Sequence, residues 1–179
     1  GFDQVVVATG VQPRLPEIPG IDHPSVASYA DVLSGAVVPG TRVAVIGAGG
    51  IGVDVSVFLT HEEEDLDDWM AHWGVGDPAL SPGGLTEAKP RTPAREVTLV
   101  QRKTTPIGIG LGKTSGWAHR AVLKQAGVEQ AGQMRLAVGE EGRAGVVQSG
   151  EAVDEELREE AVRTAVHGVA EHRELVVEL

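Results

Sequence analysis

Hydrophobic positions along the chain gather into short runs that glycine, proline and charged segments separate. Residues 5–8, 42–47 and 96–101 are each apolar, rich in β-branched side chains, and stopped by glycine or by polar residues. Runs of this length and composition predict buried strands. Strands that are apolar on both faces are typical of a parallel sheet covered by helices.

Between these runs, apolar residues recur at helical spacing. Ile51, Val55 and Leu59 follow the second run and predict an amphipathic helix. A second helix is predicted over residues 116–125, where Gly127 stops it, and a short one over residues 28–33. The prolines between residues 11 and 25 forbid a helix there and predict an extended crossover.

The other segments have different patterns. Residues 61–95 begin with an acidic run and then become rich in proline and glycine, so we expect a long connection that is functional or mobile. Residues 134–138 and 144–148 predict a hairpin across residues 139–142, and residues 154–172 an acidic amphipathic helix. The strand–helix alternation predicts an α/β fold, a Rossmann-like dinucleotide-binding domain with a mainly parallel sheet.

Composition and charge narrow the functional classes. The 179 residues suit one domain, or one domain with appendages. A net charge of -11 without a basic stripe argues against nucleic acid and against an anionic membrane surface. The sequence has no cysteine, which excludes a disulfide or a cysteine-ligated cluster within this chain. Without an apolar run of membrane-spanning length or a signal peptide, we expect a cytoplasmic protein.

The strongest motif is the G-x-G-x-x-G pattern at the end of the second predicted strand. The segment consists of Gly47, Ala48, Gly49, Gly50, Ile51 and Gly52. In this strand–turn–helix context the first glycine permits the turn, the second lets the backbone approach a pyrophosphate, and the third allows close helix–strand packing. The phosphates would then meet free amides at the positive end of the helix. The alternative is a glycine-rich turn that binds nothing.

The third predicted strand ends in Gln101, Arg102 and Lys103, with no acidic residue. NAD-preferring domains place an acid near this point for the ribose 2′-hydroxyl, whereas a basic residue accommodates the 2′-phosphate of NADP. Arg102 and Lys103 therefore predict binding of NADPH. The alternative is that they are two solvated cations at the end of a strand, with no ligand to bind. Arg102 follows Gly47 by 55 residues, where about 20 is typical, so residues 61–95 must be an excursion.

A glycine-rich loop over residues 108–114 ends in Gly112, Lys113 and Thr114. It lacks the first glycine of a Walker motif, since Ile107 stands there. Lys113 and Thr114 are candidates for a second anion-contacting loop beside the cofactor, and a plain flexible loop is the equal alternative. The histidines form no metal-binding pattern, so no metal ligand and no catalytic residue is assigned.

Several of these motifs occur in one order that resembles a known family. Residues 2–14, 20–24, 28–33, 45–54, 101–103 and 110–120 resemble the NADPH-dependent 2,4-dienoyl-CoA reductase branch of the old-yellow-enzyme and trimethylamine-dehydrogenase family. The string from Gly110 to Arg120, which includes Trp117 and His119, is the most distinctive.

The resemblance implies an FAD domain with an inserted NADPH domain. Ala8, Thr9 and Gly10 would contact FAD in residues 1–40, residues 41–130 would form the NADPH-binding domain, and residues 131–179 are a divergent acidic tail. Such enzymes carry FMN and a 4Fe-4S cluster in a barrel, and none of its motifs is present in this sequence. We therefore expect a fragment that passes hydride from NADPH to FAD, partners with the remainder of its parent flavoenzyme, and is inactive alone.

Two other functions stay open. The chain could be the NAD(P)H-binding part of another flavoprotein reductase or demethylase on the same scaffold. It could also be a non-catalytic, degenerate dinucleotide-fold module whose acidic tail contacts a protein partner.

Overall fold

The computed structural model describes residues 2–17, 21–132, 134–138, 144–148 and 173–177. Its main sheet has the strand order β1-β7-β2-β3-β4, and every neighbouring pair is parallel. The strands are β1 (Val26–Ser28), β2 (Arg42–Ile46), β3 (Glu96–Val100), β4 (Glu129–Ala131) and β7 (Arg173–Val177). The predicted parallel α/β fold is confirmed, and β2 lies at its centre.

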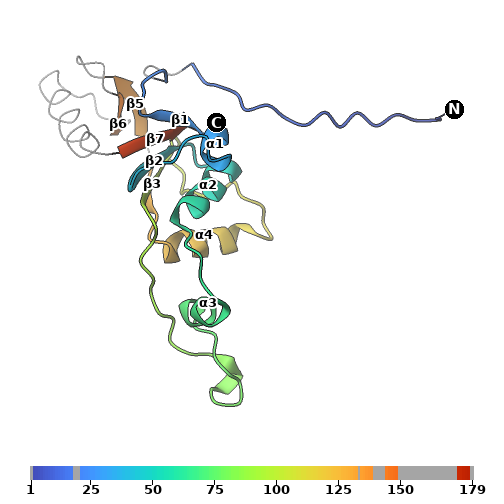
Figure 1. The fold of residues 1–179 in the computed structure, drawn as a ribbon, viewed down its shortest axis with the longest axis vertical. Coiled ribbons are helices and arrows are strands. Elements are labelled where there is room, and N and C mark those ends of the chain that lie inside the picture. Colours follow the sequence, from blue (N-terminus) through green and yellow to red (C-terminus); the bar gives the residue numbers. More distant parts are fainter. Residues whose placement is uncertain (1, 18–20, 133, 139–143, 149–172, 178–179) are drawn as a thin grey trace, which may run out of the picture.

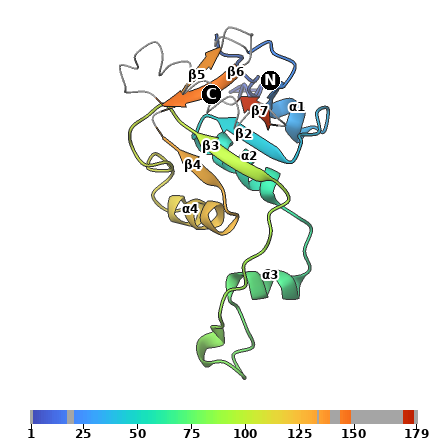
Figure 2. The same cartoon turned by 90° about the vertical axis from the view of Figure 1, so that its left-hand side faces the viewer.

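Three helices cover one face of this sheet. They are α1 (Tyr29–Leu33), α2 (Gly50–Thr60) and α4 (Gly116–Gln125), and Figures 1 and 2 show them on the side opposite the hairpin of β5 (Met134–Val138) and β6 (Ala144–Gln148). Alternation along the strands decides which residues meet the helices. The core of this face contains Val43, Val45, Val97 and Leu99 from the strands and Val32, Val53, Val55, Leu59 and Leu123 from the helices.

The sequence predicted several of these elements closely. β2, β3 and α4 lie where expected, Gly127 has φ +67° just past α4, and the predicted hairpin forms with Met134 opposite Gln148. α1 follows Ser28, whose hydroxyl accepts a hydrogen bond from the Asp31 amide at 3.1 Å. The hairpin turn at 139–142 and the helix expected over 154–172 lie outside the described residues.

One predicted strand is wrong. Residues 5–8 were expected to be a buried strand, but Val5, Val6 and Val7 are 81%, 88% and 79% exposed and run outward as extended chain (Figure 1). A strand needs a neighbour for its backbone hydrogen bonds, and no strand of the described chain lies beside this segment.

The predicted apolar stripe of α2 is right at Val55 and Leu59, both fully buried, and wrong at Ile51, which is 39% exposed. Ile51 lies in the first turn, at the carboxyl edge of the sheet, where less of the core covers the helix. Val53 takes its place on the buried face.

β7 is the main element that the sequence did not predict. It pairs with β1 on one side and β2 on the other, so residues 173–177 supply an interior strand from the segment expected as an acidic tail. The short strands β1 and β4 were not predicted either, because three residues are too few to give a periodic pattern. The division at residues 40 and 130 stays a prediction.

The excursion between α2 and β3 is a structured projection. It contains α3 (Leu66–Trp73) and the 3₁₀ turn η1 (Pro82–Gly84), and both views show it extending away from the sheet (Figures 1 and 2). The Asp65 carboxylate accepts from the Asp68 amide at 2.9 Å and starts α3. The acidic run therefore supplies the N-cap of a helix, in a segment for which the sequence predicted only a long connection.

The segment that leads back from the projection to β3 packs against α3 through Lys89. The Lys89 carbonyl lies 3.2 Å from Nδ1 of the buried His72, and the Lys89 amide donates to the Ala71 carbonyl at 3.0 Å. At the base, Arg91 and Glu64 form a half-buried ion pair with Nη1 and Oε1 3.0 Å apart. These contacts join the returning segment to α3 and to the base of the projection.

Gly74, the C-cap of α3, provides a test of this packing. Its φ is +68°, and an added Cβ would lie 2.7 Å from the Thr86 carbonyl oxygen. We expect Gly74→Ala to lower the free energy of unfolding by roughly 1–2 kcal/mol for the left-handed backbone and about 1–3 kcal/mol more for the overlap. Gly83→Ala is the matched control, since φ is +66° there and a Cβ meets nothing within 4 Å. Denaturant titrations that gave equal losses for both variants would contradict the close packing at Gly74.

Candidate functional site

The site is built at the edge of the sheet where its parallel strands end. The connection from β2 to α2 and the connection from β3 to α4 both leave from this edge, because all strands run in the same direction. In open α/β sheets, ligands bind in the crevice outside the carboxyl ends of the strands. The G-x-G-x-x-G segment and the Arg102-Lys103 pair therefore lie at one edge of the molecule.

Gly47 makes the turn out of β2. Its φ is +118°, a backbone conformation that L side chains rarely adopt, and its amide donates to the Val100 carbonyl at 2.8 Å. That hydrogen bond fixes the turn to the end of β3. A glycine is required at this position.

Gly49 is the N-cap of α2, with φ -79° and ψ -165° and no side-chain cap hydrogen bond. Gly49 and Gly50 are exposed, and a Cβ on Gly50 would meet nothing within 4 Å. The first amides of a helix have no intrahelical acceptor. The first turn of α2 therefore presents backbone donors that no side chain of its own covers.

Ala48, Ile51 and Gly52 have different surroundings. Gly52 is buried and its carbonyl accepts from the Ser56 hydroxyl at 2.7 Å. Ala48 packs against the main core, whereas Ile51 faces outward. Ala48 and Gly52 thus fix the turn to the core, while Gly49 and Gly50 remain exposed. This exposure is what the close approach of a phosphate to the backbone requires.

Gln101, the residue after β3, stabilises the turn that carries the basic pair Arg102 and Lys103. Its amide donates to the Ala131 carbonyl at 2.9 Å, and its side-chain Nε2 donates to the carbonyls of Lys103 and Thr105. Arg102 and Lys103 are exposed, and their side chains make no hydrogen bond or ion pair with the described residues. Two exposed cations without a partner in the described part of the chain are suited to bind an anion.

The loop from Pro106 to α4 is ordered by its own turns. Gly112 accepts from the Gly116 amide at 2.7 Å, Gly108 accepts from the Leu111 amide at 3.2 Å, and Arg120 Nη1 donates to the Gly108 carbonyl at 3.1 Å. The choice between an anion-contacting loop and a plain flexible loop stays a prediction.

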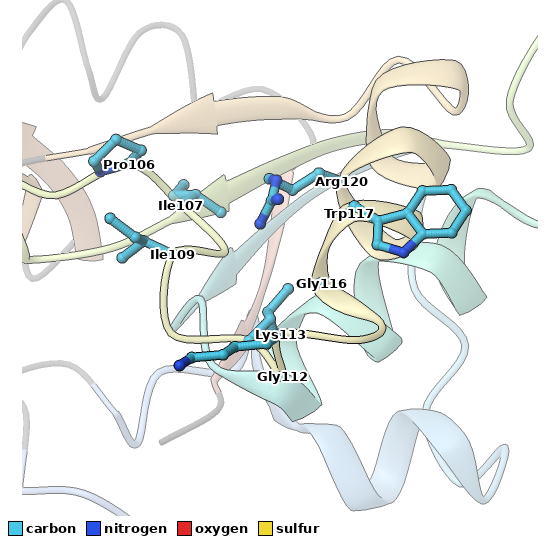
Figure 3. Close-up of a pocket in the computed structure, with 9 residues that line it drawn as sticks. Pro106, Ile107, Ile109, Gly112, Lys113, Gly116, Trp117 and Arg120 are labelled. Carbon is cyan, nitrogen blue, oxygen red and sulfur yellow. The ribbon is translucent and has the colours of Figure 1, made fainter.

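This loop and the start of α4 line an open cavity of about 300 Å³. Figure 3 shows Ile107 and Ile109 on one side, Arg120 reaching in from α4, and Lys113 along the lower rim. Lys113 and Thr114 are both exposed, and the Thr114 carbonyl accepts from the Trp117 indole at 2.9 Å. Trp117 also lines the cavity, from α4, and its indole extends away from Ile109 (Figure 3).

Arg120 and Ile109 were not among the residues that the sequence assigned to a site. The string Gly110 to Arg120 had been singled out as distinctive, but spacing alone gave Arg120 no role. Another contact joins the two helices of this edge, since His119 Nδ1 lies 3.9 Å from Asp54 Oδ1.

Ala8, Thr9 and Gly10 lie in the extended N-terminal segment, where all three are exposed and Gly10 has φ +76°. Figure 1 shows this segment running away from the sheet, so the structure does not bring these residues to the Gly47–Gly52 turn. The assignment of these three residues to FAD stays a prediction.

The described residues contain no group of three or more side chains that could hold a metal ion. Across the same ranges, no helix has the length and apolar character to cross a membrane. The arrangement at the carboxyl edge fits a dinucleotide, because it offers exposed amides, a glycine turn and two cations without a partner among the described residues.

Comparisons with known proteins agree with this geometry. A metal reductase of Desulforamulus reducens is 27% identical over 124 residues, which is 69% of this chain and 18% of that protein. The structure of 2-naphthoyl-CoA reductase, bound to 2-naphthoyl-CoA, is 19% identical with a TM-score of 0.51 and matches 95% of this chain and 22% of that one. A NAD-dependent persulfide reductase from A. fulgidus is also 19% identical, with a TM-score of 0.43, over 78% of this chain and 21% of that one.

The chain thus spans about a fifth of the length of the proteins it matches. The family model described as pyridine nucleotide-disulphide oxidoreductase matches residues 1–170. With its parallel sheet and glycine turn, the chain belongs to the pyridine nucleotide-disulphide oxidoreductase family, whose members are flavin- and NAD(P)-dependent oxidoreductases.

Proposed function

We propose that this chain binds NADPH at the carboxyl edge of its sheet and presents it to the FAD of a larger flavoenzyme. The observation that carries the proposal is the first turn of α2, which has an exposed glycine N-cap without a side-chain hydrogen bond. The residues Gly47 to Gly52, including Ala48, Gly50 and Ile51, would hold the diphosphate. NADPH supplies a hydride, and the residues of this chain bind and orient it.

The preference for NADPH over NADH rests on Arg102 and Lys103. Both are exposed, lack a partner among the described residues, and follow the strand next to β2. A guanidinium can fork onto the 2′-phosphate, while the ammonium adds a point charge. Lys113 and Thr114 would contribute from the neighbouring loop.

FAD would be contacted by Ala8, Thr9 and Gly10, in a segment that we assign to the FAD domain. The exposed valines before them support this assignment, because a run of apolar residues is stabilised when another part of a protein covers it. In this division, residues 41–130 are the NADPH-binding unit.

For the parent enzyme we propose reduction of an enoyl or dienoyl thioester. The motifs shared with the 2,4-dienoyl-CoA reductase branch support it, and the fold similarity to 2-naphthoyl-CoA reductase is compatible with it. FMN and a 4Fe-4S cluster would belong to other parts of that enzyme, since the 179 residues contain no cysteine to ligate iron. We assign no catalytic residue to this chain and expect it to be inactive alone.

Calorimetric titration of the 179-residue chain tests the proposal. We expect NADPH to bind about 10- to 100-fold more tightly than NADH, the range that charge-assisted hydrogen bonds to one phosphate can give. Equal affinities would remove the 2′-phosphate assignment, and the absence of binding by either dinucleotide would remove the site.

A further inference from the structure

We propose that the projection between α2 and β3 is a docking element, and that its partner is a cationic amphipathic helix of another protein. The contact surface, called the α3 face below, consists of Leu66, Trp69, Met70 and Trp73. The projection leaves the sheet after the end of α2 and returns at the start of β3, so it lies at the edge opposite the glycine turn. The proposal is therefore independent of the dinucleotide site.

The projection contributes nothing to the core of the sheet. Both hydrophobic clusters of the described chain are formed by residues outside the range 61–95. The projection has local contacts of its own instead, because the Asp65 side chain caps α3, Gly74 ends it, and Lys89 contacts His72. Connections of this length are often functional, and both views show this one extending into solvent (Figures 1 and 2).

The α3 face is an apolar stripe along one side of the helix. Its residues follow Leu66 by three, four and seven positions, which places them on the same side. The ring centroids of Trp69 and Trp73 are 6.3 Å apart. Leu66 is 68% exposed and Trp69 is 45% exposed, whereas His72 is buried beside the returning segment. Exposed apolar surface with a tryptophan at its centre is typical of a protein–protein contact.

Charge selects the kind of partner. Residues 61–95 contain eight acidic residues and three basic ones, and Asp67 and Asp68 are exposed on α3 itself. Glu62 and Glu63, just before the helix, are exposed as well. This charge repels nucleic acid and an anionic membrane, and the net charge of -11 repels a second copy of the chain. It attracts a cationic protein surface.

The shape of the α3 face narrows the partner further. α3 has 8 residues, about two turns, with one apolar stripe between acidic positions. A helix with an apolar stripe of its own, bordered by lysine or arginine, would cover the tryptophan and place its cations near the aspartates.

Synthetic peptides of leucine and lysine serve as probes of the intact 179-residue chain. The first is an amphipathic helix of about 18 residues, roughly five turns, with all its leucines on one side. In calorimetric titration we expect it to bind with a Kd on the order of 10 μM. A peptide of the same composition in scrambled order keeps the charge but has no apolar side. It should bind about tenfold more weakly or less.

Variants of the chain locate the contact. Trp69→Ser should weaken the amphipathic peptide about tenfold or more, because a tryptophan at the centre of a contact contributes strongly to binding. Leu66→Ser should also weaken it, and this variant leaves the ring contact between Trp69 and Trp73 in place. Leu15→Ser is the matched control, since Leu15 is equally exposed but lies in the N-terminal segment, so its loss should not change the affinity.

Asp67→Asn tests the role of charge. We expect a loss of affinity of about two- to fivefold that disappears at high salt, because exposed charges interact weakly and are screened. Glu17→Gln removes an exposed carboxylate far along the chain and should have no effect.

Several outcomes would overturn the proposal. If the amphipathic peptide does not bind, or the scrambled peptide binds equally well, the α3 face recognises no helix. The same conclusion follows if Trp69→Ser and Leu66→Ser both bind like the wild type. Sedimentation velocity of the chain alone tests the other occupant, because self-association that Trp69→Ser abolishes would identify a second copy instead of a cationic partner. The affinity for NADPH should be the same with and without the peptide, so none of these failures would affect the dinucleotide site.

Discussion

Gly49→Asp should strongly weaken NADPH binding while leaving the fold as stable as the wild type, or slightly more stable. The backbone at Gly49, with φ -79° and ψ -165°, is already the extended conformation of a helix N-cap, and α2 has no acidic residue in its first turn. Aspartate is a preferred N-cap and interacts favourably with the helix dipole, so the free energy of unfolding should rise by a few tenths of a kcal/mol.

The same carboxylate would stand where the diphosphate is expected. Two like charges about 5 Å apart repel by roughly 3 kcal/mol at an effective dielectric constant near 20, which corresponds to about a 100-fold loss of affinity or more. Gly49→Asn is the control, since it adds a capping side chain of similar size without charge and should weaken binding less. Calorimetry and denaturant titration give the two quantities. Wild-type affinity in Gly49→Asp would show that the phosphates do not approach this turn.

Arg102→Gln should change the choice of cofactor without changing stability. We expect the affinity for NADPH to fall about 10- to 100-fold and the affinity for NADH to stay the same, because only NADPH carries the phosphate that the guanidinium would bind. Arg102 is exposed and unpaired among the described residues, so its replacement removes no structural contact of the described chain.

Lys124→Gln serves as the control for net charge. Lys124 is exposed in the last turn of α4, at the opposite edge of the sheet, so its loss changes the net charge equally but lies far from the proposed site. If both variants reduced NADPH affinity to the same extent, the effect would come from overall charge and not from recognition of the 2′-phosphate. A parallel loss of NADH affinity in Arg102→Gln would also contradict the assignment.

How much the sequence predicts differs from element to element. β2, β3 and α4 were predicted because each is stopped by local signals, such as glycine or charged residues, that act on the chain whatever its surroundings. Residues 5–8 are apolar like the interior of β2, but they are exposed. β2 has a neighbouring strand on each side, whereas residues 5–8 have none in the described chain. The composition of a segment does not show whether another strand will lie beside it.

For the site, the sequence determined the glycine turn and the basic pair, because backbone freedom and charge are properties of single residues at fixed spacing. Gly47 at φ +118° and the uncapped Gly49 agree with that prediction. Whether those residues hold NADPH stays a proposal, which the variants above test.

Taken alone, the sequence determined the α/β class, the elements β2, β3 and α4, the glycine turn and the candidate phosphate and 2′-phosphate groups. Only the tertiary structure decided that residues 173–177 insert beside β2, that residues 61–95 form a structured projection, and that Arg120 lines a cavity with the 106–112 loop. The physical reason is that pairing and packing join residues far apart in the chain, and a local pattern carries no information about which distant segment will be its partner.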